Sequence, residues 1–472
     1  MRINTIIEQA VSKFKQDMLL FCQEAAEAPL TPDTASMFAQ GLQKTLAAVG
    51  RTAFQTFLQM KEKNQDVVMH HNELFRFKYE SEKHFMTLWG KIPVRRRIYQ
   101  NASDSKTYVP LDAAWGMQEE FMMLEAREAV AFACAYVTPE ETNKLLEKTA
   151  FFHPHPTQIK RCIETLKAQV ATEQAAMDDR IREQEQAPDA VRVLAASADG
   201  VNLMLNEPEQ AGAKRGRPAQ RPGKDNSQAS STAYRNAMVG AISFYGAVPK
   251  GKQAPQRLSC RYTSHMPEAN APTFKSKFEA ELAAAERQAP ANVIKVLLCD
   301  GARSLWNYID NRACFEGYEK IIDYYHTVEH LSLAAEALFG KGSGKAKAWY
   351  AKYRKQLLEK DDGARSVLRS MDYYSSTRAL SKSRAEAVSV QRTFFERNQG
   401  RMTYAAFRRR GLPIGSGPVE AACKTIVKTR MCRSGMRWSR KGGQRILDLR
   451  TYVLSNRWDA FWNEYKKLLR AV

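Results

Sequence analysis

Two apolar segments that each end in Asp-Gly constrain the fold of this chain more than any other feature. VRVLAASADG ends at Asp199 and its following glycine, and VIKVLLCDGA carries the same pair at Asp300. Apolar runs of this length, bounded by turn residues, predict buried strands. Helical patterns over 273–288 and 303–312 surround the second strand. From residue 191 onward we therefore expect a mixed sheet flanked by helices.

Further segments extend this sheet. We expect VNLML, directly after Asp199, to form a hairpin with the strand before it, because Asp-Gly is a common turn pair. AMVGAISFYG and YEKIIDYYH predict two more strands. Residues 207–235 are polar and too poor in apolar side chains to pack, so we expect an insert there. Residues 325–400 are predicted to be helical.

The N-terminal region is predicted to be mostly helical. Residues 2–27 and 32–65 have helical patterns, and Thr31 or Asp33 is available to cap the second helix. Residues 84–112 alternate apolar and basic residues and then break at NASDSK, which predicts a strand, a turn and a strand.

A pair of helices follows in TPEETNKLLEKT and TQIKRCIETL. Thr138, Pro139 and Glu141 predict a capping box at the start of the first, and Thr157 opens the second. Two helices with a short turn, and with Lys160 and Arg161 early in the second, suggest a DNA-binding helix-turn-helix. An ordinary helical hairpin has the same pattern, so both interpretations stay open.

The charge is concentrated at one end of the chain. The net charge is +21, and residues 341–472 contain 31 basic and 10 acidic side chains, whereas the preceding residues contain 41 of each. Such one-sided positive charge favours a phosphate backbone as partner. A basic surface that only contacts solvent is the alternative.

Other classes of protein fit the sequence poorly. The sequence contains no run of about 18 apolar residues, so no membrane span is predicted. The charged N-terminus lacks the apolar core of a secretory signal, so we expect a cytoplasmic protein associated with the nucleoid. The eight cysteines are scattered without the spacing of a zinc motif.

Three acids are candidates for metal-dependent chemistry. Asp199 and Asp300 follow apolar strands, and strand ends open into the ligand crevice of an open sheet. Glu420 follows the turn in IGSGPVEAACK, just inside a predicted helix. Three such carboxylates could hold two Mg²⁺ or Mn²⁺ ions and promote in-line phosphoryl transfer. An Asp-Gly pair is also an ordinary turn, which is the structural alternative.

These stretches resemble bacterial insertion-sequence transposases of the DDE type, particularly the ISKra group, with kinship to Mutator-like and hAT elements. The matching segments are ADG at 198–200, CDGARSLW at 299–306, IIDYYHTVEHL at 321–331 and GLPIGSGPVEAACKTIVKTRMCRSGMRWS at 411–439. The resemblance covers roughly residues 85–470.

The resemblance implies a fold, a site and a substrate. The fold is an α/β (α+β) RNase H-like catalytic core with a helical insertion, preceded by a mostly helical DNA-binding region. Asp199, Asp300 and Glu420 would bind the metal ions. The protein would cleave transposon-end DNA and join it to target DNA, acting as a homodimer or higher oligomer. Relatives often carry Cys-x-x-Cys before Pro-Leu-Asp; here NASDSKTYVPLD has no cysteine, which removes a zinc ribbon.

The resemblance also points to His326, the last residue of an Asp-x-x-His signature. An imidazole beside the scissile phosphate could act on a phosphate oxygen or on the nucleophile. The alternative is that His326, Glu329 and His330 are residues of a helix cap and of the core edge.

Two basic segments are further candidates for DNA contact. Lys214, Arg215 and Arg217 lie in KRGRP, which resembles a minor-groove AT-hook but is equally typical of a solubilising linker. In the second segment basic residues recur after the expected catalytic helix. We expect phosphate contacts there and stacking of an aromatic ring on a base, although such a ring is more often buried. The residues are Arg430, Arg433, Arg437 and Trp438.

These patterns define the expected domain organisation and leave three other functions open. The alternatives are a transposase-derived protein that binds DNA without cutting it, an RNase H-like nuclease without strand transfer, and a regulator that uses only the helix-turn-helix. The expected domains are an N-terminal helical region (1–83), a β-ribbon with helix-turn-helix (84–190), a first core part (191–330), a helical insertion (331–400) and a last core part with basic helices (401–472).

Overall fold

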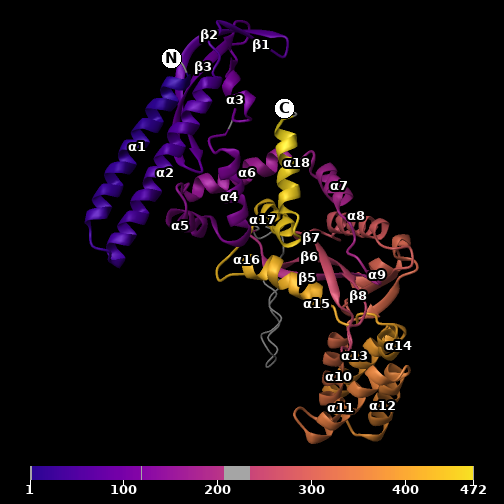
Figure 1. The fold of residues 1–472 in the computed structure, drawn as a ribbon. Helices are drawn as coiled ribbons and strands as arrows, with labels where there is room; N and C mark the ends of the chain where they lie inside the picture. The colour runs from indigo at the N-terminus through magenta and orange to yellow at the C-terminus, as the bar shows by residue number, and fades with distance from the viewer. Residues whose placement is uncertain (1–2, 119, 207–233, 471–472) are drawn as a thin grey trace, which may run out of the picture. The chain divides into compact units, whose positions relative to one another are not determined.

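The computed structural model describes residues 3–118, 120–206 and 234–470 (Figure 1). The chain forms two compact units. The first unit contains Met1–Ala175 and Asp459–Val472, and the second contains Ala176–Trp458. The last fourteen residues thus group with the N-terminal unit, whereas the sequence assigned them to the end of the core.

The first unit begins with a helical hairpin, α1 (Ile3–Glu27) and α2 (Pro32–Lys61). Of the two caps expected for α2, Thr31 is the one used, because its side chain accepts the backbone N–H of Thr34 in a capping box. Phe21 and Phe38 stack between the helices at 4.8 Å.

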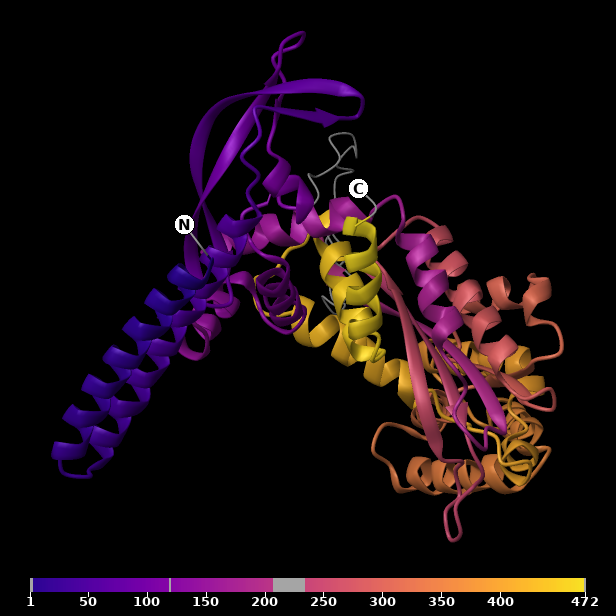
Figure 2. The same cartoon turned by 45° about the horizontal axis from the view of Figure 1, so that its top comes forward.

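The hairpin is followed by a four-stranded antiparallel sheet, in which β2 and β3 form a long ribbon (Figure 2). Its strands, in spatial order, are β1 (Val67–His70), β2 (Glu73–Thr87), β3 (Gly90–Asn101) and β4 (Thr107–Tyr108).

The sheet begins earlier than the sequence predicted. His71 and Asn72 both adopt positive φ, 48° and 64°, and form the tight turn that joins β1 to β2. The expectation that residues 1–83 are helical is therefore wrong after α2. The strand pattern of β2 was hidden because most of its length is solvent-exposed and polar, which leaves little alternation.

Five helices complete the first unit. The predicted capping box of α5 is confirmed, since Thr138 accepts from Glu141 N and Glu141 accepts from Thr138 N. Tyr465 ties the C-terminal helix into this unit: its hydroxyl accepts from Arg127 at 2.8 Å and donates to Gln169 at 2.5 Å. The helices are α3 (Pro110–Ala114), α4 (Leu124–Tyr136), α5 (Pro139–Thr149), α6 (Pro156–Val170) and α18 (Trp458–Arg470).

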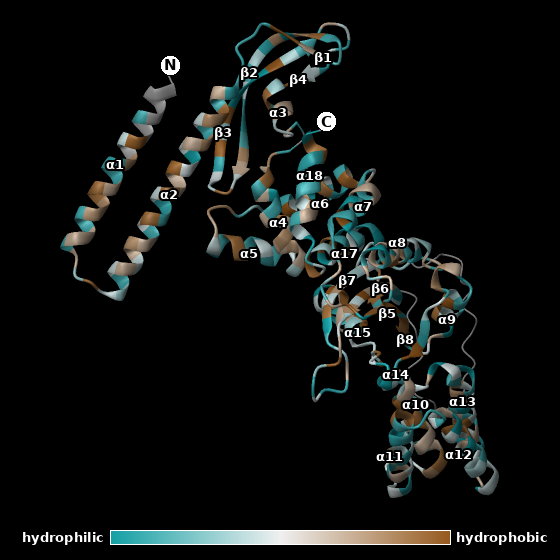
Figure 3. Ribbon diagram, turned by 45° about the vertical axis from the view of Figure 1, so that its right-hand side comes forward, coloured by the Kyte–Doolittle hydropathy of each residue, from teal (hydrophilic) through white to brown (hydrophobic). Residues whose placement is uncertain are grey.

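The second unit is built on a five-stranded mixed sheet, and the expected mixed α/β class is confirmed. The spatial order is β7-β6-β5-β8-β9; β5, β6 and β7 are antiparallel, and β8 and β9 run parallel to β5. Figure 3 shows the hydrophobic colour concentrated on these strands. They are β5 (Val193–Met204), β6 (Tyr234–Tyr245), β7 (Arg257–His265), β8 (Ile294–Cys299) and β9 (Glu319–Ile322).

Two details of the sheet differ from expectation. The Asp199-Gly200 pair is not a turn, because β5 continues through it and pairs with β6 from Val193 to Met204. Twelve consecutive cross-strand pairs with β6 outweigh the local turn preference of Asp-Gly. Strand β7 was not expected, since its arginines interrupt the apolar pattern.

Helices cover the sheet on both faces. One core cluster joins the sheet to α8, α9 and the inserted helices, and the other joins β5 and β6 to the helices that follow residue 416. The helical segments of this unit are α7 (Gln174–Gln184), α8 (Pro272–Gln288), α9 (Arg303–Asp310), η1 (Ala313–Phe315), α10 (Tyr324–Phe339), α11 (Gly344–Glu359), α12 (Gly363–Thr377), α13 (Lys382–Asn398), η2 (Gln399–Arg401), α14 (Tyr404–Arg409), α15 (Gly417–Ala422), η3 (Cys423–Lys428), α16 (Thr429–Met431) and α17 (Arg440–Leu454).

A buried ionic network stabilises the second unit. Arg457 donates to both carboxylate oxygens of Glu281, at 2.9 and 2.5 Å, and to both oxygens of Glu185, at 2.6 Å each. These two carboxylates raise the pKa of Arg457 despite its burial. Glu281 is itself completely buried on α8.

Replacing Glu281 with Ala should destabilise the protein by about 3 kcal/mol, because it leaves Arg457 buried with an incomplete set of partners. Urea unfolding followed by circular dichroism measures this change. The matched double variant, Glu281→Met with Arg457→Met, should recover most of the loss, since the buried charge is then gone. A single variant as stable as the wild type would contradict the assignment.

Candidate active site

The register of the parallel strands aligns three aspartates. Ala196 of β5 pairs with Leu297 of β8, and three residues further along each strand lie Asp199 and Asp300. Cys299 of β8 pairs with Ile322 of β9. The residues that follow this pair, Asp300 and Asp323, are therefore neighbours as well. The backbone N–H of Asp323 donates to Cys299 O at 2.8 Å, which continues the pairing. Adjacent strands lie about 4.8 Å apart, so the aspartates follow one edge of the sheet.

Asp199 and Asp300 are half-buried and electrostatically coupled. The Oδ1 atom of Asp199 accepts from Gly200 N at 2.6 Å, and that of Asp300 accepts from Ala302 N at 3.0 Å. Burial raises the pKa of Asp300; the charge of Asp199 raises it further, and the Ala302 N–H opposes the rise. Burial and the neighbouring carboxylate thus both disfavour the charged form of Asp300.

Glu420 lies in the first turn of α15, on a helix that packs against the same strand as Asp199. Its Oε1 accepts from Ser416 Oγ at 2.9 Å, and its side chain is exposed. One turn further, the thiol of Cys423 donates to Asp199 Oδ2 at 3.5 Å. Cys423 begins a π-helical turn, a feature that often marks functional sites. As the side chains lie, the described part of the chain contains no cluster of three or more His, Cys, Asp or Glu that could hold a metal ion.

Asp323 and Ser416 are site residues that the sequence analysis missed. Asp323 is completely buried and caps α10 by accepting His326 N at 2.6 Å. Its second oxygen accepts the backbone N–H of Ser416, whose hydroxyl contacts Glu420. Asp323 thus fixes the turn that carries Glu420. The signal was present in DYYH and GSG, but their separation of more than ninety residues hid the contact.

His326 lies close enough to Asp300 for the two side chains to interact electrostatically, and its catalytic role stays a prediction. Its charge lowers the pKa of Asp300, in opposition to burial. The Nε2 atoms of His326 and His330 are 3.2 Å apart. His330 stacks on Phe394 of α13 at 3.6 Å, and burial lowers the pKa of His330.

A polar pocket of about 620 Å³ opens beside the Asp300 loop. Helix α9 contributes Arg303 and Trp306, and the inserted helix α13 contributes Phe394 and Arg397. Arg401 stacks on Trp306 at 4.2 Å. Guanidinium groups and aromatic rings together suit a ligand that combines negative charge with a planar group.

The segment after Glu420 differs from expectation at Arg430. Arg430 is only 2% exposed and lies over the Trp438 ring at 5.5 Å. The indole of Trp438 donates to Met431 O at 2.9 Å. Arg430 is buried within the fold, which does not support its expected phosphate contact, whereas the base stacking expected of half-buried Trp438 stays a prediction. Helical spacing alone could not show that Arg430 faces inward.

Other basic residues in this segment face solvent. Arg437 is exposed, and Arg433 is half-buried with its Nε donating to Thr429 O at 3.3 Å. Lys424 and Lys428 are exposed at four and eight residues beyond Glu420. Neither lysine was predicted as a DNA contact from the sequence, although their spacing was visible.

The remaining predicted DNA contacts lie elsewhere. Lys160 forms an exposed ion pair with Glu140 at 3.1 Å. Arg161 is exposed and, with Lys83 and Thr157, lines a pocket of about 680 Å³ at the start of α6. The AT-hook candidates lie outside the described residues; they are Lys214, Arg215 and Arg217.

Comparisons with known proteins give little further information. No protein-family model matches the chain, and no curated protein matches it. Among solved structures, it is similar to the Drosophila P element transposase strand transfer complex at 11% identity, over 74% of this chain and 83% of that chain. The TM-score is 0.24, which does not establish a shared fold. No helix among the described residues is long and apolar enough to cross a membrane.

In the metal-free protein, replacing Asp300 with Asn should raise the melting temperature at about pH 7. The pKa of Asp300 is higher in the folded state than in the unfolded state. The wild-type protein therefore loses stability as the pH rises from the pKa of Asp300 in the unfolded chain to its pKa in the folded protein. Asn avoids that loss and can keep the Ala302 hydrogen bond. Thermal unfolding in EDTA over a pH series measures the difference.

The gain in melting temperature should disappear at about pH 3, where Asp300 is protonated in both the folded and the unfolded wild-type protein. A gain that is the same at every pH would contradict the electrostatic cause. Asp372→Asn, on the exposed surface of α12, is the control and should show no such pH dependence.

Proposed function

We propose that this chain is a DDE-type transposase that cleaves transposon-end DNA and transfers the strand to target DNA. The observation that carries the proposal is the alignment of Asp199, which lies within β5, with Asp300, which directly follows the adjacent parallel strand β8, beside the helix that bears Glu420. In this proposal the five-stranded sheet is an RNase H-like core, and α10–α13 are its helical insertion.

The donor set fits magnesium. Carboxylate oxygens are the ligands that Mg²⁺ or Mn²⁺ prefers, and Asp199, Asp300 and Glu420 would supply them. The raised pKa of Asp300 reflects burial and repulsion from Asp199, and a bound cation would relieve both. Two such ions, when bound, supply Lewis-acid stabilisation of the attacking and leaving oxygens of a phosphodiester.

The residues around the acids have positioning roles in this proposal. Asp323 holds the Ser416 turn by its backbone, and Ser416 Oγ orients Glu420. The thiol of Cys423 fixes one oxygen of Asp199. His326, half-exposed next to Asp300, would contact a phosphate oxygen.

The proposed DNA path follows the helix that carries Glu420. Exposed Lys424, Lys428 and Arg437 and half-exposed Arg433 continue from the candidate site. They belong to residues 341–472, which account for the whole net charge of +21. Double-stranded DNA is therefore the proposed partner, and its phosphates are the groups these side chains would neutralise.

Replacing Asp199 or Asp300 with Asn, or Glu420 with Gln, should reduce Mg²⁺-dependent DNA cleavage by at least a thousandfold, because each change removes a charged oxygen ligand. The substrate is a supercoiled plasmid that carries the gene with its genomic flanks. Gel analysis of nicked and joined products measures both steps. The control variant Asp372→Asn should cleave like the wild type.

Two outcomes would redirect the proposal. Cleavage without joined products would favour the nuclease without strand transfer. DNA binding with no cleavage by the wild type in Mg²⁺ or Mn²⁺ would favour a catalytically silent DNA-binding protein. DNA cleavage that persists in a variant with all three substitutions would contradict the assignment of these acids as metal ligands.

The double variant Arg433→Ala with Arg437→Ala should reduce the slope of log affinity against log salt by about 2, close to one for each lost phosphate contact. Fluorescence anisotropy with a labelled duplex at several salt concentrations measures the slope. Arg369→Ala on α12, whose guanidinium pairs with Asp362, is the control. An unchanged slope in the double variant would remove these arginines from the DNA path.

A further inference from the structure

The α1–α2 hairpin exposes more apolar side chains than a soluble helix pair requires. In α1, the half-buried positions facing α2 recur every three or four residues, and Phe21 among them stacks on Phe38. These positions are Phe14, Met18, Phe21 and Ala25. On its other side α2 packs against β3, where Gln59 bonds to Arg95 and Leu58 is buried. The helix α2 therefore lies between α1 and the sheet.

A second apolar stripe runs along each helix beside the first. In α1 it is exposed and contains Val11, Leu19, Cys22 and Ala26. In α2 it contains Leu42, Leu46, Val49, Ala53, Phe57 and Met60, of which Leu46 is 44% and Phe57 is 49% exposed. An α-helix turns by about 100° per residue. The centre of each stripe therefore lies roughly 90° around its own helix axis from the side that contacts the other helix, and the rotation has the same sense in both helices.

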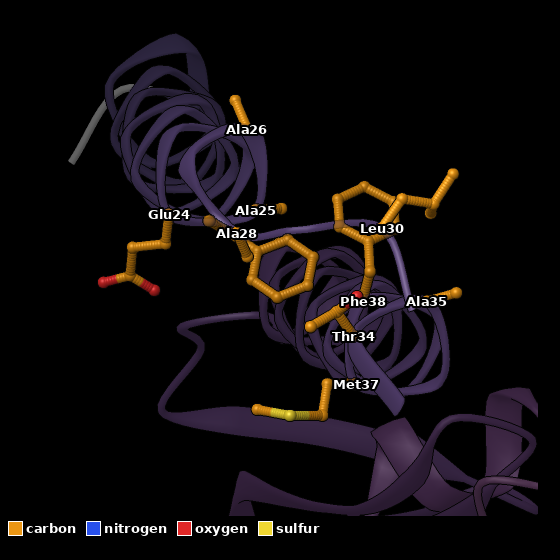
Figure 4. Close-up of a pocket in the computed structure, with 10 residues that line it drawn as sticks. Glu24, Ala25, Ala26, Ala28, Leu30, Thr34, Ala35, Met37 and Phe38 are labelled. Carbon is orange, nitrogen blue, oxygen red and sulfur yellow. The ribbon is translucent and has the colours of Figure 1, made fainter. Parts of the chain in front are cut away.

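The two stripes lie on one side of the hairpin. Because the helices are antiparallel, the same rotation from their contact line leads to the same side of the pair. Figure 4 shows this at the hairpin tip: Ala26 and Ala35 point to one side, and Glu24 and Met37 point to the other. We call the first side the apolar face and define it by the residues of the two stripes.

The charges of the hairpin identify the kind of partner. Residues 3–61 contain five basic and five acidic side chains, so the hairpin is neutral and offers no attraction to DNA. Among its described side chains, Glu8 and Lys15 are the charged ones that fall on the apolar face, two turns apart on α1. Two copies related by a twofold axis would bring Glu8 of each next to Lys15 of the other.

We propose that the apolar face binds the same face of a second copy of this chain, so that two hairpins form a four-helix bundle. The proposal is independent of the proposed function, since it uses none of the acids. An isologous interface needs a surface that is complementary to itself. An apolar stripe with one acid and one base at matched positions meets that need.

The experiment is sedimentation equilibrium of the full-length chain at high salt without nucleic acid. The wild type should be a dimer at micromolar concentration. Leu46→Glu with Phe57→Glu should raise the dimer dissociation constant by about a hundredfold or more, because two charges per copy enter an apolar interface. Unchanged dimerisation of this variant, or a wild type that stays monomeric, would overturn the proposal.

The matched control is Met37→Glu, which places the same charge on the opposite side of α2 at a residue 70% exposed. It should dimerise like the wild type. Circular dichroism must show equal helix content in all variants. Dimer loss in Met37→Glu alone would assign contact to the other side of the hairpin and overturn the proposal.

A charge-reversal pair tests the register without disturbing the apolar residues. Glu8→Lys and Lys15→Glu should each dimerise more weakly by themselves, since each brings like charges together. Mixed in equal amounts, they should form a heterodimer at least as stable as the wild type. Failure of the mixture to recover would contradict the twofold pairing, even if the folded monomers are intact.

Discussion

The parallel pairing of β8 with β5 and of β9 with β8 is the constraint on which the candidate site depends. It places Asp199 of β5 in line with Asp300 and Asp323, which directly follow β8 and β9, although these residues are widely separated in sequence. Such an arrangement is unfavourable in itself, because like charges repel and burial raises the pKa of Asp300. The completely buried apolar residues behind them, including Leu297 and Ile322, offset that cost.

Asp323 has a different role from Asp199 and Asp300. Asp323 satisfies two backbone N–H groups and is completely buried, so it acts as a structural anchor. Its bond to Ser416 joins the start of the helices α10–α14 to the turn that follows them, as does the bond from Tyr324 N to Ile414 O. These helices therefore begin and end next to the turn that carries Glu420.

The sequence could predict what local patterns determine. Apolar runs marked the strands that present Asp199 and Asp300, and the capping box at Thr138 fixed a helix start. Features set by distant segments could not be read in the same way. Pairing with β6 overrides the turn preference at Asp199-Gly200, and packing turns Arg430 inward over Trp438. The function of Asp323 depends on a turn far along the chain, which no local pattern reports.

The two proposed associations, with DNA and with a second copy of the chain, should respond to salt in opposite ways. Contacts to phosphates weaken as salt rises, because the gain from counterion release falls. Contacts of an apolar face are not screened, and salts excluded from protein surfaces strengthen them. The basic residues of the proposed DNA path belong to the second unit, and the neutral hairpin belongs to the first. If both proposals hold, salt would release DNA while leaving dimers assembled, and the two interactions could be measured separately in one protein.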